Sequence, residues 1–293
     1  MNLARALMQG GDRVGGLREL EALSEMDPEA EGLELAGVVR LLEERQFDQA
    51  LVKADEFTRK YPDAASVQNL RAVALFGLGR TEDGVAAFEA ARRLEPGNVT
   101  ATRNLAVLKL RTEGADEARK VLESGLGASP DNVRLLLLMA ELEVEQGDPA
   151  QAGRFLQRAV DAAPDALELR VVLARYHLQS GEAEAALAAL EGARERHGDN
   201  TALLEVLGMA QVTAGRLDTG ITTLRRLAEV RPESPEVYFR LAQAQGQAGR
   251  IGDARRSLRQ VLERDERHAG ALLTLARLER QEGRDGEALT LAR

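Results

Sequence analysis

The sequence predicts an all-α protein, a solenoid of antiparallel helix pairs. Apolar residues recur at three- and four-residue steps, which is the period of a helix with one buried face. The same order of breaks and small residues returns every 34 residues, for example from Pro130 to Pro164. A single helix pair of this length cannot cover its own apolar stripe, so a neighbour of the same kind must bury it.

The stretch 133–164 illustrates one repeat. Two apolar runs have helical spacing, and their members are Leu135, Leu136, Leu138, Met139, Leu142, Ala152, Phe155, Leu156, Ala159 and Val160. Between the runs, Gly147 suits the left-handed residue that ends a helix, and Asp148 can cap the free amides of the next one. Pro149 suits a first helical position, and Pro164 stops the second helix.

Three columns of residues follow the 34-residue step. The column that ends each repeat is mostly proline: Pro28, Pro62, Pro96, Pro130, Pro164, Gly198, Pro232 and Glu266. The second-helix column holds only glycine or alanine: Gly16, Ala50, Gly84, Ala118, Ala152, Ala186, Gly220, Ala254 and Ala288. The first-helix column is Ala4, Val38, Ala72, Ala106, Ala140, Ala174, Gly208, Ala242 and Ala276. Small side chains at both columns let the paired helices approach closely where they cross.

The turn between the two helices has a glycine column of its own. Its members are Gly11, Gly79, Gly147, Gly181, Gly215, Gly249 and Gly283. Arg45 replaces glycine in one turn, and Gly114 shifts it by one position in another. We expect these two turns to differ locally from the rest.

This pattern resembles the tetratricopeptide repeat over the whole chain. The resemblance implies a right-handed superhelix, although tryptophan is absent and leucine replaces most large aromatic residues of the family. A solenoid grows in one dimension, so we predict a single array over 1–293. Its predicted parts are a partial repeat 1–30, full repeats 31–64, 65–98, 99–132, 133–166, 167–200, 201–234 and 235–268, and a partial repeat 269–293.

Both chain ends cut a repeat open, so we expect a fragment of a longer protein. The stretch 288–292 is as apolar as an internal helix, whereas arrays usually close with a polar capping helix. We also expect this apolar end to permit end-to-end self-association. No secretory signal is visible at Met1, which in a fragment indicates nothing about the compartment.

Composition narrows the possible functions. Cysteine is absent, which excludes disulfides, thiolate metal sites and cysteine nucleophiles. The net charge is -9, and arginines alternate with acidic residues, so we predict no nucleic-acid partner. No stretch approaches the ~20 apolar residues of a transmembrane helix. The excess of arginine over lysine indicates a bacterial gene. The cluster Arg255, Arg256 and Arg259 is interpreted as a solvated helix face neutralised by Asp253 and Glu263.

No convergent set of catalytic groups is found, so we predict no enzyme activity, no cofactor and no metal site. His177, His197 and His268 fall in different repeats without ligand-spaced partners, and are interpreted as surface or packing residues. The glycine clusters follow no strand, which argues against phosphate-binding loops. Glu141 and Glu145 share a helix face, but no complementary acid, base or metal set accompanies them.

In the tetratricopeptide repeat family, the first helices line a concave surface that holds peptide segments. The family's positions correspond here to Val39, Leu42, Asn69, Val73, Phe76, Arg103, Val107, Leu110, Arg111, Glu141, Arg175, Leu178, Met209 and Phe239. An apolar strip rimmed by Arg103 and Arg111 would suit a hydrophobic peptide carrying acidic residues. Two alternatives stay open: the apolar members merely pack neighbouring helices, and Glu141 pairs internally with Arg175.

A closer resemblance concerns short phrases such as Asn69-Leu70-Arg71-Ala72, Phe88-Glu89-Ala90-Ala91 and Leu204-Glu205-Val206-Leu207-Gly208. They resemble the PEP-CTERM/exosortase-associated TPR-repeat lipoprotein family of bacteria. That resemblance implies a scaffold of exopolysaccharide production and protein sorting, anchored in the cell envelope or periplasm by an N-terminal lipid. Without it, the expected location is cytoplasmic. The chain contains no cysteine that could carry the lipid.

Three functions follow from these observations. The first is a non-catalytic protein-protein interaction scaffold that binds a partner peptide or domain in its groove. The second is the repeat arm of a larger enzyme, such as a glycosyltransferase, which would require a catalytic domain beyond Arg293. The third, direct polysaccharide binding, is weaker because the groove lacks the aromatic platforms on which sugars stack.

Overall fold

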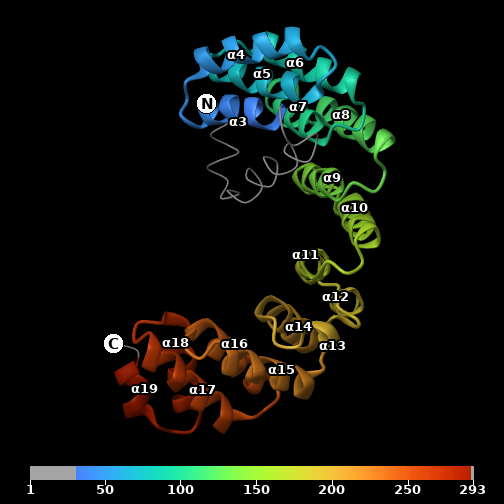
Figure 1. Ribbon diagram of the computed structural model, residues 1–293. Helices are drawn as coiled ribbons and strands as arrows, with labels where there is room; N and C mark the ends of the chain where they lie inside the picture. Colours follow the sequence, from blue (N-terminus) through green and yellow to red (C-terminus); the bar gives the residue numbers. More distant parts are fainter. Residues whose placement is uncertain (1–30, 292–293) are drawn as a thin grey trace. The chain divides into compact units, whose positions relative to one another are not determined.

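The computed structural model describes residues 31–291, and the side chains of 35–289. Seventeen helices and no strand occupy this range, which confirms the predicted all-α fold of helix pairs (Figure 1). The first helices start at a constant 34-residue step, at Glu31, Ala65, Val99, Val133, Leu167, Thr201, Pro235 and Ala269. The expectations about a partial repeat in 1–30, including Ala4, Gly11, Gly16 and Pro28, and about the last two residues lie outside the described residues.

The chain divides into two compact units, which we call the N-terminal unit (31–158) and the C-terminal unit (159–291). Each unit is described by itself. The prediction of one continuous array therefore stays a prediction.

The N-terminal unit consists of helices that alternate between first and second members of a pair. Their bounds are α3 (Glu31–Glu43), α4 (Phe47–Lys60), α5 (Ala65–Gly77), α6 (Thr81–Leu94), α7 (Val99–Thr112), α8 (Ala115–Ala128), α9 (Val133–Glu145) and α10 (Pro149–Ala162), the last of which contains the boundary between the units. From α3 to α8, each helix packs on the helix that follows it in the chain. Figure 1 shows this side-by-side order for α3 to α8.

The C-terminal unit continues with the same alternation. Its helices are α11 (Leu167–Gln179), α12 (Ala183–Ala189), α13 (Ala193–His197), α14 (Thr201–Thr213), α15 (Leu217–Val230), α16 (Pro235–Gln247), α17 (Ile251–Arg264), α18 (Ala269–Gln281) and α19 (Asp285–Leu291). Its core consists of aliphatic residues such as Leu203, Leu224 and Leu258, which are almost completely buried.

The small-residue columns lie where paired helices touch. A Cβ added to Gly220 would lie 2.6 Å from Cγ2 of Val212, and one added to Gly208 would lie 2.9 Å from the side chain of Leu224. Ala118 and Ala152 are buried in the same way. Larger side chains at these positions would push the helices apart, which confirms the reason given for the columns.

The turn glycines adopt the left-handed backbone conformation that glycine favours. Gly147 has a φ of 75°, and Asp148 caps α10 by accepting a hydrogen bond from the amide of Gln151 at 3.0 Å. The expected difference at Gly114 is confirmed, since its φ is 99° and its place in the turn is shifted. The expected difference at Arg45 is wrong, because Arg45 itself adopts a φ of 59° and keeps the turn of its neighbours.

One second helix departs from the expected pattern. All second helices from α4 to α17 contain 14 residues except one, which is split into α12 and α13. Gly192 between the two pieces has a φ of 69°, and Gly198 after them replaces the usual proline with a φ of 20°. The left-handed residue Gly192 interrupts the helical hydrogen bonds that run unbroken through the other second helices.

Four of the first helices are capped by the side chain of the residue that precedes them. The side chains of Asn98, Asn132, Asn200 and His268 each accept a hydrogen bond from the amide three residues later. A capped N-terminus satisfies a backbone amide that would otherwise lack a partner. His268 thus has a structural role in its repeat.

Candidate partner-binding groove

An open pocket of about 320 Å³ lies in the N-terminal unit, between the first helices α7 and α9 and the second helix α8. Its lining residues are Ala106, Val107, Leu110, Arg111, Ala118, Leu122, Leu138, Glu141, Leu142 and Glu145. Four of the predicted groove residues are therefore brought together, namely Val107, Leu110, Arg111 and Glu141.

The small columns help to open this pocket. Ala106 on α7 and Ala118 on α8 are both buried, and neither side chain extends beyond a methyl group. Val107, Leu110 and Leu138 are only half-buried, so each keeps an apolar surface that faces solvent. The pocket thus offers an apolar lining that a partner side chain could cover, and covering it would release water from that surface.

Charged side chains of both signs lie beside the apolar lining. Arg111 extends from the last turn of α7, while Glu141 and Glu145 share one face of α9. Partial burial raises the pKa of the Glu141 carboxyl, and the negative charge of Glu145 raises it further. Within the N-terminal unit, none of these three side chains has an ion-pair or hydrogen-bond partner.

Other predicted groove residues of the N-terminal unit are parts of its packing. Leu42 and Asn69 are buried, and Nδ2 of Asn69 donates to Oδ1 of Asn98 at 3.0 Å. Phe76 is half-buried and its ring stacks on Phe88, with the centroids 5.6 Å apart. This burial favours the packing alternative for Leu42 and Asn69.

The remaining members show a similar range of exposure. Val39 and Val73 are partly buried and pack against the core of the N-terminal unit. Arg103, also on α7, donates from Nη2 to Oδ1 of Asn104 at 3.4 Å and does not line the pocket.

Four predicted residues belong to the C-terminal unit. Arg175 and Met209 are exposed, while Leu178 is partly buried and packs against the core around α11 and α14. The ring of Phe239 lies 4.7 Å from that of His268, between centroids. Because Glu141 and Arg175 lie in different units, their predicted pairing stays a prediction.

Repeat positions alone missed part of the pocket. Leu138, Leu142 and the two alanines were not expected to line it, although the small columns carried the signal for the alanines. The sequence could have indicated the space left by two adjacent small residues, but not which side chains border it.

Residues 31–291 show neither a cluster of metal-binding side chains nor a membrane-spanning helix. This part of the chain contains no group of three or more His, Cys, Asp or Glu side chains that could hold a metal ion. None of its helices has the length and apolar composition needed to cross a lipid bilayer.

Stacked helix pairs with an open, partly apolar groove define a helical-repeat solenoid. Models of the tetratricopeptide repeat match residues 75–142, 114–176, 143–210 and 177–245, and a second set matches 35–99 and 239–293. The chain belongs to the tetratricopeptide repeat family, as the sequence pattern predicted. Proteins of this fold are generally non-catalytic scaffolds.

Solved structures share the fold at low sequence identity. A tetratricopeptide repeat protein from Parabacteroides merdae is 16% identical, with a TM-score of 0.52 over 78% of this chain and 90% of that one. PilW, a type IV pilus biogenesis factor, is 19% identical, with a TM-score of 0.52 over 67% of this chain and 90% of its own. A MamA structure is 22% identical, with a TM-score of 0.50 over 58% of this chain and 93% of its own. No curated protein sequence matches the chain.

Proposed function

We propose that this protein is a non-catalytic protein-protein interaction scaffold that binds a peptide segment of its partner in the groove of α7, α8 and α9. The observation that carries the proposal is the pocket itself, where an apolar lining lies beside three charged side chains that lack partners within the N-terminal unit. A free apolar surface next to unpaired charges is the composition of a protein-binding site.

The chemistry of the pocket defines the peptide. Burying one large apolar side chain against Val107, Leu110 and Leu138 would contribute about 1.5–3 kcal/mol. An acidic residue of the peptide would pair with Arg111, and a basic residue would pair with Glu141 or Glu145. The partner therefore carries an apolar anchor with charges of both signs around it, which extends the acidic peptide expected from the sequence.

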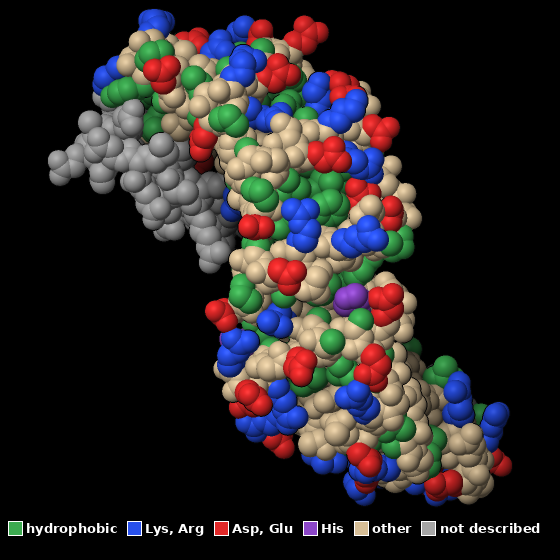
Figure 2. All heavy atoms as spheres, turned by 90° about the vertical axis from the view of Figure 1, so that its right-hand side faces the viewer, with side chains coloured by type: hydrophobic (Ala, Val, Ile, Leu, Met, Phe, Trp, Pro, Cys, Tyr) green, Lys and Arg blue, Asp and Glu red, His purple; other side chains and the backbone are tan. Residues whose placement is uncertain are grey.

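The surface charges are consistent with a protein partner. On the face shown in Figure 2, Lys and Arg side chains are interspersed with Asp and Glu and do not gather in one patch. A nucleic-acid site usually presents a continuous basic stripe. We therefore keep a protein or peptide as the proposed partner.

The test is a selection of peptides from a displayed random library on the purified full chain. Affinities of the selected peptides are then compared for the unmodified protein, Val107→Asp and Val52→Asp. Val52 is 60% exposed on α4 of the same unit and provides the same substitution away from the pocket. We expect Val107→Asp to weaken binding at least tenfold and Val52→Asp to leave it unchanged. The proposal that this groove binds a peptide would be refuted if the selected peptides bound both variants equally well, or if the selection enriched no peptide.

The finer assignments from the sequence remain proposals. The link to PEP-CTERM/exosortase-associated lipoproteins, and with it an envelope location, would be supported by a signal peptide and a lipid-attachment cysteine encoded upstream. A catalytic domain in the same gene would favour the alternative, a repeat arm of a larger enzyme. End-to-end self-association would appear as a concentration-dependent mass in light scattering.

A further inference from the structure

A second pocket, of about 450 Å³, lies in the C-terminal unit between α13, the start of α14, and α15. It differs from the groove because second helices supply most of its lining. Its lining residues are Arg194, Gly198, Asp199, Leu204, Thr222, Arg225, Arg226 and Glu229. Three arginines around one hollow are unusual in a chain whose net charge is -9.

The first of these arginines lies in the broken second helix. Arg194 occupies the repeat position that Val160 holds one repeat earlier and Ala228 one repeat later, and both of those residues are buried. Arg194 itself is exposed, and it lies in the short helix α13 between Gly192 and Gly198. On the unbroken helix α6 the same repeat position holds Arg92, which is half-buried, so the arginine of the broken helix is the more exposed of the two.

Repeat geometry explains why a second cation lies next to it. In the N-terminal unit, Nη2 of Arg92 on α6 donates to Oγ of Ser124 on α8 at 2.6 Å. The residues at the equivalent repeat positions on α13 and α15 are Arg194 and Arg226. Two arginines therefore occupy the repeat positions that hold Arg92 and Ser124 in the N-terminal unit, and both line the same pocket.

Both acidic residues of the pocket, Asp199 and Glu229, already form hydrogen bonds with Arg226. Nε and Nη2 of Arg226 donate to the two carboxylate oxygens of Asp199 at 2.7 and 2.6 Å, and its Nη1 donates to Glu229 at 2.8 Å. These bonds raise the pKa of Arg226, with Asp199 contributing most, and lower the pKa of Asp199. Arg194 and Arg225 keep no hydrogen-bond or ion-pair partner among the described residues, and the three arginines and two carboxylates of the lining leave the pocket with a net charge of +1.

We propose that this pocket binds a phosphate group, presented by a small phosphorylated molecule or by a phosphorylated residue. A phosphate monoester carries about -1.5 to -2 charges at neutral pH, so it is attracted to a net positive pocket, and the guanidinium groups of Arg194 and Arg225 are free to donate to it. The planar fork of arginine also fits phosphate oxygens with two parallel hydrogen bonds. The Thr222 hydroxyl donates to the carbonyl of Asp218 at 2.9 Å, so arginines are the donors available to the ligand.

The experiment is isothermal titration calorimetry on the full chain, with ionic strength held constant by sodium chloride. The probes are inorganic phosphate, glycerol phosphate, and a phosphoserine peptide paired with its unphosphorylated form. The order of the affinities identifies the source: glycerol phosphate binds more tightly for a small-molecule ligand, and the phosphopeptide for a phosphorylated protein. The absence of phosphate binding above the chloride control would overturn the proposal.

Two double variants locate the binding. Arg194→Gln with Arg225→Gln should weaken phosphate binding at least tenfold. Arg259→Gln with Arg280→Gln removes the same charge from exposed residues of the same unit; Arg259 stands at the repeat position of Arg225, and neither residue lines the pocket. This control should stay within twofold of the unmodified protein. Equal weakening by both pairs would show that only net charge matters and would also overturn the proposal.

The single variant Arg225→Gln guards against a folding defect in the double variant. Arg225 is exposed, so this substitution should leave the thermal unfolding midpoint of the protein unchanged. Binding should fall at least threefold, and unchanged binding in this variant would contradict the assignment. Peptide binding in the groove is measured separately, so failure of this site leaves the proposed scaffold function standing.

Discussion

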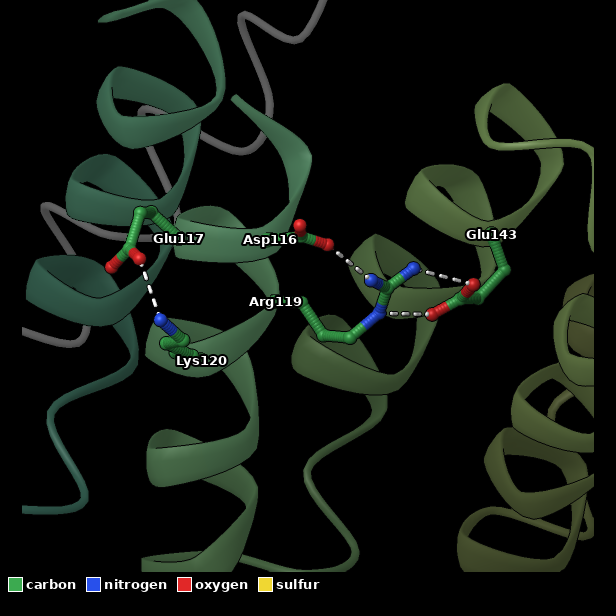
Figure 3. Close-up of polar contacts among 5 residues, drawn as sticks. All are labelled: Asp116, Glu117, Arg119, Lys120 and Glu143. Carbon is green, nitrogen blue, oxygen red and sulfur yellow. Dashed lines mark hydrogen bonds and ion pairs between the residues drawn. The ribbon is translucent and has the colours of Figure 1, made fainter. Parts of the chain in front are cut away.

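Arg119 on α8 binds Glu143 on α9 through both ends of its guanidinium group. Nε and Nη2 donate to the two carboxylate oxygens at 2.9 Å each, and Figure 3 shows Asp116 contacting the same arginine from its own helix. The Glu143 side chain is only 6% exposed. The pair therefore ties one repeat to the next through a nearly buried charge.

The same pair returns four repeats later. Nε of Arg255 lies 2.8 Å from Oε1 of Glu279, whose side chain is 1% exposed. At the intervening positions Gln211 accepts a hydrogen bond from Thr223, and Gln245 accepts one from Ser257, both at 2.7 Å. The last turns of these first helices thus carry a buried polar residue at equivalent repeat positions. Its partner is an arginine in two repeats, a threonine in one and a serine in another.

We expect Arg119→Ala to destabilise the protein more than Glu143→Ala. Arg119→Ala leaves the buried Glu143 without its partner, which costs about 3 kcal/mol or more. Glu143→Ala should cost about 2 kcal/mol, because Arg119 is 28% exposed and can regain water. Urea unfolding measures both values, and Glu145→Ala is the exposed control. Equal or reversed costs would contradict the burial argument.

Gly220→Ala should destabilise the C-terminal unit by about 1–3 kcal/mol through overpacking. The added Cβ would lie 2.6 Å from Val212 Cγ2 and 3.3 Å from the carbonyl oxygen of Gly208. Gly252→Ala on α17 is the matched control, since a Cβ there meets nothing within 4 Å. That variant should gain up to about 1 kcal/mol from better helix propensity. Differential scanning calorimetry should show midpoints moving in opposite directions.

Arg45→Gly should stabilise the N-terminal unit by about 0.5–1 kcal/mol. Arg45 is the only residue other than glycine with a positive φ among the described residues, at 59°. A side chain in this conformation places Cβ close to the backbone, and glycine removes that strain. The reciprocal variant Gly147→Ala should lose a similar amount, because Gly147 has a φ of 75°. Chemical unfolding of both variants tests the sign, and a loss of stability in Arg45→Gly would contradict it.

Glu141→Gln should change how stability depends on pH. Partial burial, followed by the Glu145 charge, raises the folded-state pKa of Glu141 above its ordinary value of 4.5. The folded state therefore holds this proton more tightly, so its contribution to stability is present at low pH and is lost as pH rises through the raised pKa. The variant should be slightly more stable than the unmodified protein at pH 7, and the difference should shrink at pH 4. Glu56→Gln, an exposed control on α4, should show no such change.

The sequence alone determined the repeat and its local chemistry. The proline, alanine and glycine columns predicted the helix pairs and their crossings, because helical period, capping and left-handed turns depend on neighbouring residues in the chain. Residue type predicted the wrong turn at Arg45, because this arginine adopts the left-handed conformation that an arginine rarely adopts. Residue type did not indicate the break at Gly192 either, because glycine within a helical pattern does not reveal whether the helix breaks.

Only the tertiary structure decided which side chains meet across repeats. Arg255 was expected to be neutralised by Asp253 and Glu263, yet it pairs with Glu279 and Glu282 of the following repeat. The lining of the groove by Leu138, and the hollow beside Arg194, depend in the same way on distances between helices. Such distances arise from how side chains fill the space between packed helices, and a linear period of 34 residues carries no information about that filling.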